Sequence, residues 1–108
     1  MEQFEEKYSR EAVIKRLDEY PPGDLVTMSM YTQYLSNEVK QMGFIEGTPE
    51  WGIYFELKRA ELFFDAELEK EAISILKSVR KMAEEQGLTS FLKQNSEKFQ
   101  RYIERWWE

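Results

Sequence analysis

The apolar residues of this chain recur at intervals of three and four positions, and this spacing constrains the fold more than any other feature. Residues at these intervals line one face of an α-helix. Each run stops at glycine or proline, and the four breaks are Pro21-Pro22-Gly23, Gly43, Gly47-Thr48-Pro49-Glu50 and Gly87-Leu88-Thr89-Ser90. Since no segment of the sequence shows the alternation of a strand, we expect an all-α protein.

Three helices are predicted directly from these breaks. The first ends at Tyr20, and Ser9 has the residue type of a cap at which the helix restarts. The second covers about 24–42, and the last covers about 90–107. The apolar stripe of the second is Met28, Tyr31, Leu35, Val39 and Met42. That of the last is Leu92, Phe99, Ile103 and Trp106, with an interruption at Asn95-Ser96.

The stretch 49–86 has two interpretations. Thr48 and Pro49 have the residue types of a helix cap and a first helical position. One apolar stripe continues along the whole stretch: Ile53, Leu57, Ala60, Phe64, Leu68, Ile75, Val79 and Met82. A single helix here has about 37 residues, well beyond the usual length of about 11 to 12. The alternative is two helices joined near 65–69, which the usual length favours.

If the stretch divides, residues 53–86 resemble one helix pair of a tetratricopeptide repeat. Five positions match the intervals of that repeat: Ala60, Phe63, Ala72, Leu76 and Val79. Four positions depart from its residue types: Glu56, Arg59, Val79 and Glu84 stand where the repeat has Trp, Leu, a small residue and Pro. No second copy is present, whereas a solenoid of such repeats needs about three. The resemblance implies a groove for a peptide or a neighbouring helix.

These elements predict one all-helical domain over residues 1–108. The short turns favour antiparallel neighbours. The expected architecture is therefore a four- or five-helix antiparallel bundle or a set of stacked helical hairpins.

The chain has no histidine and no cysteine, the residue types on which many catalytic and metal sites depend. Its glycines are scattered singly, so it has no phosphate-binding loop. No apolar run reaches the roughly 18 residues of a membrane span, and the acidic start is unlike a signal peptide. We expect a soluble, cytoplasmic protein without membrane association, catalytic residues or cofactor.

Among the side chains that remain, the carboxylates of Asp and Glu are the candidates for a metal site. Two pairs of acids, each four residues apart on a predicted helix face, are the candidates for a metal-dependent hydrolase: Glu61 with Asp65, and Glu67 with Glu71. Such a site needs a further pair from a second helix. We interpret these acids instead as a solvated face paired with nearby bases.

Nucleic-acid binding is disfavoured by the net charge of −6, because proteins that bind phosphates usually carry a basic stripe. The short cluster Lys77, Arg80 and Lys81 would have to serve that purpose.

Aromatic residues make up 15% of the chain, and large aromatics are enriched at protein interfaces. The predicted partner-binding residues are Trp107, Trp106, Tyr102, Phe55, Phe44 and Ile45. The alternative for each is a core position, with Phe44 and Ile45 closing one end of the core. The leading hypothesis is a non-catalytic regulator, adaptor or inhibitor that binds another protein. A structural subunit that self-associates, for instance as a homodimer, is the alternative.

Overall fold

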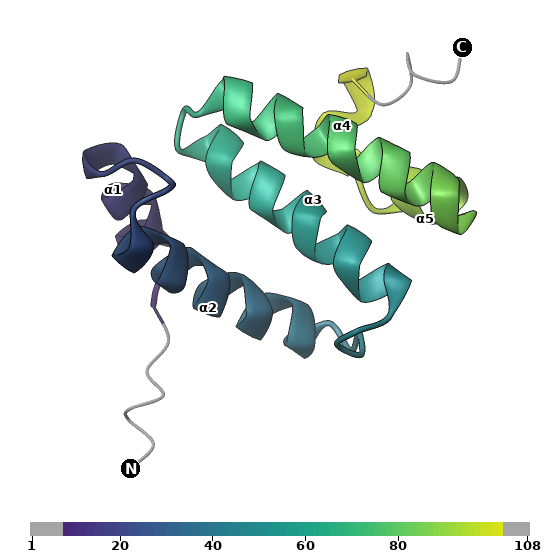
Figure 1. Ribbon diagram of the computed structural model, residues 1–108, viewed down its shortest axis with the longest axis horizontal. Coiled ribbons are helices and arrows are strands. Elements are labelled where there is room, and N and C mark those ends of the chain that lie inside the picture. Colours follow the sequence, from purple (N-terminus) through teal and green to yellow (C-terminus); the bar gives the residue numbers. More distant parts are fainter. Residues whose placement is uncertain (1–7, 103–108) are drawn as a thin grey trace.

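The computed structural model describes residues 8–102 and is helical almost throughout (Figure 1). Its helices are α1 (Arg10–Glu19), α2 (Leu25–Gln41), α3 (Pro49–Asp65), α4 (Glu69–Gln86) and α5 (Thr89–Gln94), followed by the 3-10 turn η2 (Glu97–Phe99). The helical conformation resumes at 100–102, and residues 8–102 contain no strand. The expectation of an all-α fold of packed helices is confirmed.

Side-chain caps fix where the first three helices begin. The Ser9 hydroxyl accepts a hydrogen bond from the backbone N–H of Ala12 at 3.1 Å. Asp24 accepts one from Thr27 at 3.1 Å. Thr48 accepts one from Trp51 at 3.2 Å, with Pro49 in the first turn. Each cap satisfies a donor that a helix start leaves without an intrahelical partner, so these boundaries follow from local sequence.

The central stretch divides into two antiparallel helices, α3 and α4, as the length argument favoured (Figure 1). The turn between them has Glu67 at φ 65°, a left-handed conformation usually taken by glycine. The N–H of Leu68 donates to the carbonyl of Phe63 at 2.8 Å and closes the end of α3. Because a glutamate fills this position, the sequence carries no stop signal there.

Helix α3 lies between α2 and α4, and α1 and α5 also contact it (Figure 1). Packing on several sides buries six of its residues: Ile53, Tyr54, Leu57, Ala60, Leu62 and Phe63. The predicted stripe is wrong at Phe64, which is 37% exposed, whereas Phe63 is 2% exposed. Phe63 meets the ring of Tyr31 on α2 edge-on, with centroids 5.2 Å apart. Contact with α2 therefore selects the face of α3 that is buried.

The stripe predicted for α2 is wrong at its two ends. Met28 and Met42 are exposed, whereas Thr27, the residue before Met28, is fully buried. Burial of Thr27 is possible because its hydroxyl accepts from Arg16 Nε and donates to Asp24, both at 3.0 Å. Arg16 on α1 also bonds the Asp24 carboxylate, so this cluster joins α1 to the start of α2.

The last predicted helix, over about 90–107, is interrupted. Helix α5 ends at Gln94, and no side chain caps its start at Leu88. The buried Ser96 hydroxyl donates to the carbonyl of Leu92 at 2.6 Å, and the Asn95 amide donates to that of Phe91 at 2.9 Å. These bonds compete with the helical ladder and end it. The predicted contributions of Phe4, Ile103, Trp106 and Trp107 lie outside the described residues.

We expect Leu57→Ala to lower the free energy of unfolding by about 2–5 kcal/mol, because Leu57 is fully buried and its truncation leaves a cavity. Urea denaturation followed by circular dichroism measures the change. Leu25→Ala is the matched control, since Leu25 is 80% exposed, and it should change stability by less than about 0.5 kcal/mol in dilute solution. Equal losses in the two variants would contradict the assigned core.

Candidate protein-binding cavity at the turn between α2 and α3

Phe44 and Ile45 are adjacent in the turn between α2 and α3, yet their environments differ. Phe44 is partly buried, with its ring centroid 4.7 Å from that of Tyr54 and 5.7 Å from that of Phe91. It closes one end of the core. Ile45 is 72% exposed. The alternative in which both residues close the core therefore fits Phe44 alone, and partner binding stays the prediction for Ile45.

Ile45 lies at a cavity of about 420 Å³ between the end of α2 and the start of α3. Its lining consists of Ser36, Asn37, Lys40, Phe44, Ile45, Glu46 and Trp51. The volume falls in the range of about 300–1,000 Å³ that is usual for ligand-binding sites. Helix α2, the turn and α3 thus each contribute to one depression, which polar and apolar groups line in about equal measure.

The turn is held in place by Thr48 and by two glycines. The Thr48 hydroxyl donates to the carbonyl of Ile45 at 2.7 Å and accepts from the N–H of Trp51 at 3.2 Å. Gly43 and Gly47 have φ of 92° and 94°, which few other residues adopt. The helix cap therefore also fixes Ile45 relative to Trp51.

Sequence reasoning missed the polar residues of the lining and one aromatic residue, Trp51. Its ring stacks on that of Phe55, with centroids 5.1 Å apart and 27° between the planes. Phe55 packs partly buried against the core and supports Trp51 from one turn further along α3. The spacing of four residues between them, directly after the predicted cap, was the signal available in the sequence.

The structure does not bring the other predicted contact residues to this cavity. Tyr102 packs against the core and its hydroxyl donates to Glu69 at 3.4 Å, beside the far end of α3. Helix α3 is about 25 Å long at the helical rise of about 1.5 Å per residue, so Tyr102 belongs to another region. Trp106 and Trp107 lie outside the described residues.

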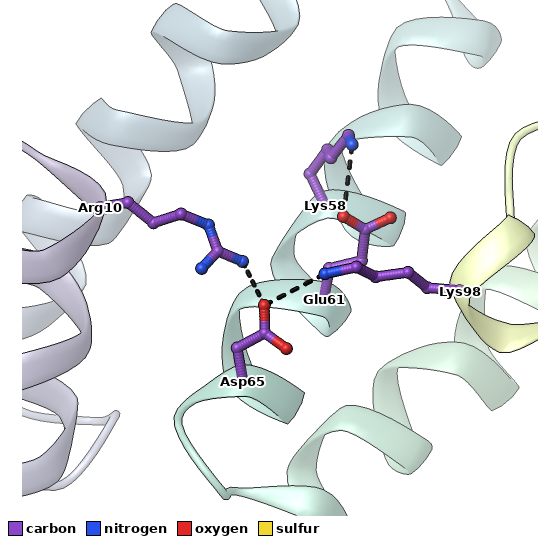
Figure 2. A network of polar contacts seen from close by, with 5 residues as sticks. All are labelled: Arg10, Lys58, Glu61, Asp65 and Lys98. Carbon is purple, nitrogen blue, oxygen red and sulfur yellow. Dashed lines mark hydrogen bonds and ion pairs between the residues drawn. The ribbon is translucent and has the colours of Figure 1, made fainter.

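Two of the four candidate carboxylates, Glu61 and Asp65, lie in ion pairs toward that far end (Figure 2). Glu61 accepts from Lys58 at 3.2 Å, and Asp65 is bonded by both Arg10 of α1 and Lys98 of η2. Glu67 lies in the turn before α4, so it does not share a helix face with Glu71 as predicted. Within residues 8–102 no group of three acids is placed to hold a metal ion.

Asp65 joins three segments of the chain through these bonds. Its partial burial alone would raise the pKa of the carboxyl, but the hydrogen bonds from Arg10 and Lys98 outweigh this and hold the pKa below its ordinary value of 3.8. A second lowered pKa is that of Asp24, whose carboxylate accepts from Thr27 and Arg16. Both acids are therefore ionised at neutral pH and hold helices together.

Comparisons with known proteins identify no relative. No family model, curated protein or solved structure matches this chain. The α3–α4 hairpin has the arrangement that the tetratricopeptide resemblance implies, but no family match accompanies it. A search of the described helices for one with the length and apolar character to cross a membrane finds none.

We expect Asp65→Asn to lower the free energy of unfolding at neutral pH by about 0.5–1 kcal/mol, because it weakens two ion pairs that are each of a kind worth about 0.2–1 kcal/mol. Because the folded-state pKa is lowered, the stabilisation is complete above the ordinary pKa of 3.8 and is lost as the pH falls through the folded-state value. The difference between variant and parent should therefore shrink below about pH 4.

Urea titrations at a series of pH values measure this difference. Asp18→Asn, at an exposed position on α1, is the control and should change stability by less than about 0.5 kcal/mol at any pH. A difference for Asp65→Asn that stays constant into acid would show that the ion pairs do not stabilise the fold.

Proposed function

We propose that this protein is a non-catalytic binding protein, a small regulator, adaptor or inhibitor, that takes a side chain of a partner protein into the cavity at the α2–α3 turn. The observation that carries the proposal is the exposure of Ile45, 72% of whose surface is open to solvent beside a cavity that Trp51 and Phe44 line. Exposure of the isoleucine side chain to water is unfavourable. An apolar partner that covers this side chain would therefore gain the free energy of burying it.

A protein partner suits this surface better than a small ligand. A second exposed apolar side chain, Met42 at the C-cap of α2, precedes Ile45 by three residues and is 59% exposed. Tryptophan and methionine are enriched at interfaces, and anchors there fill pockets ringed by polar groups. Here Ser36, Asn37 and Lys40 supply that ring.

The lining does not favour catalysis. It offers one ammonium group, one carboxylate, an amide and a hydroxyl, with no histidine or cysteine beside them. A serine hydroxyl needs an adjacent base to become a nucleophile, and Lys40 and Glu46 are the ionisable side chains of the lining. The set is suited to hydrogen bonding around an apolar anchor.

Selection from a random peptide display library against the purified protein tests the proposal. We expect enriched peptides that carry a leucine, methionine or aromatic anchor, with affinities that fall at least about tenfold on Ile45→Asp, equivalent to about 1.4 kcal/mol. Because Ile45 is exposed, the substitution should leave the helical circular dichroism unchanged.

Ser74→Asp is the control variant, since it adds the same charge at an exposed position on α4. It should bind the selected peptides as the parent does. Failure to enrich any peptide whose binding depends on Ile45 would sink the proposed site.

A further inference from the structure

Helix α2 has an exposed face without an acidic residue, in a chain that contains 21 acids. The structure describes this helix and its C-cap throughout, and the exposed residues are Leu25, Val26, Met28, Ser29, Thr32, Gln33, Lys40, Gln41 and Met42. Three of them at the start of the helix are apolar, and Leu25 is 80% exposed. Figure 1 shows α3 along one side of α2 and no described helix along the other.

This face leads along the helix into the cavity. Leu25, Ser29, Thr32, Ser36 and Lys40 follow one another at intervals of three or four residues, so they lie along one edge of α2. Ser36 and Lys40, at the far end of that edge, also line the cavity. One helix edge therefore carries an exposed apolar side chain at its start and, at its end, a depression of mixed lining that contains Phe44, Ile45 and Trp51.

We propose that the occupant of the cavity is Leu25 of a second copy of this chain, in a dimer whose two α2 helices pack antiparallel about a twofold axis. The inference rests on the proposed function, which makes the cavity the binding site, and it names the partner. In a twofold interface each copy offers the same surface to the other, so one edge with an anchor and a pocket forms two such contacts.

The register follows from placing the twofold axis midway along this edge. Leu25 then lies opposite Lys40 of the second copy, at the wall of its cavity, and Thr32 lies opposite Gln33. Ser29 lies opposite Ser36, where small side chains allow the helix axes to approach to the short end of the usual 8–10 Å. The partly exposed Asp24 carboxylate falls near the Lys40 ammonium of the second copy, and symmetry makes this opposite-charge pair twice.

Charge selects a second copy over a foreign basic partner. Two chains of net charge −6 repel, and α1, α3 and α4 all carry acids outside the core, among them Glu11, Asp65 and Glu85. At physiological ionic strength charges interact over about 8 Å, so the residues at the contact decide whether two acidic chains can approach. A basic partner would gain most at those acidic surfaces. The exposed residues of α2 itself include no acid, so in this register acids approach one another only at the ends of the helix, where Asp24 of one copy comes near Lys40 and Glu46 in the cavity lining of the other.

Light scattering of the full chain over a micromolar to millimolar range tests the dimer. We expect the mass to rise to that of a dimer with concentration. Ser29→Glu places an acid at the closest approach of the two helices and should raise the dissociation constant at least about tenfold. Ser74→Glu makes the same change at an exposed serine of α4 and should leave the dimer unchanged.

The absence of cysteine allows the register to be tested directly. Thr32→Cys puts one thiol per chain next to the twofold axis, where a disulfide can span the two helices. Mild oxidation should link most of the chains into covalent dimers that reductant separates. Ser74→Cys, on α4, should form no more than background dimer at the same concentration.

A parent protein that stays monomeric at every concentration overturns the inference. So does a dimer that survives Ser29→Glu, or one in which Thr32→Cys does not cross-link above the Ser74→Cys control. The Thr32→Cys result decides the matter if Ser29→Glu fails to fold.

The two proposals fail separately. If selected peptides bind a monomeric protein and their binding depends on Ile45, the proposed function is supported. The same result shows that a second copy is not the occupant of the cavity. Since a dimer would block the cavity, the peptide selection is also run on Ser29→Glu. If no such peptide is selected on Ser29→Glu, the cavity is not a binding site, whatever the oligomeric state of the parent protein.

Discussion

Burial of α3 on several sides is the constraint on which the rest of the structure depends. Helices α1, α2, α4 and α5 all contact it, and its fully buried residues include Ile53, Leu57 and Ala60. Removal of apolar surface from water is the main favourable contribution to folding, and a chain of this size has room for one such centre. The other helices are ordered around α3 because each buries its own apolar stripe against it or against a helix that touches it.

The candidate site follows from this arrangement. Helix α2 packs against α3 along one side and against α1 near its start, which leaves its other side without a described helix. The turn that connects α2 to α3 must close the end of the core with Phe44, and the same turn then directs Ile45 outward. The cavity and the exposed face of α2 that lacks acids are thus consequences of α3 being covered more completely than α2.

The opposite end of α3 is held by charge. Arg10 and Lys98 converge on Asp65 from segments far apart in the sequence (Figure 2). Such partly exposed pairs contribute modestly to stability, but they connect α1 and η2 to the end of α3. Of the acids that suggested a metal site, Asp65 joins helices in this way, whereas Glu61 pairs with Lys58 within α3.

Helix starts at Ser9, Asp24 and Thr48 could be predicted from the chain because a cap is a contact within four residues and needs no tertiary partner. The break between α3 and α4 was left open because Glu67 adopts a conformation for which glycine is the usual signal. Which of Phe63 and Phe64 is buried depended on Tyr31, a residue on another helix. Helical spacing specifies which residues share a face, and only the packing of neighbouring helices specifies which face is covered. For the same reason the sequence pointed to Phe44 and Ile45 as contact residues, while tertiary packing buried the first, exposed the second and brought Trp51 beside them.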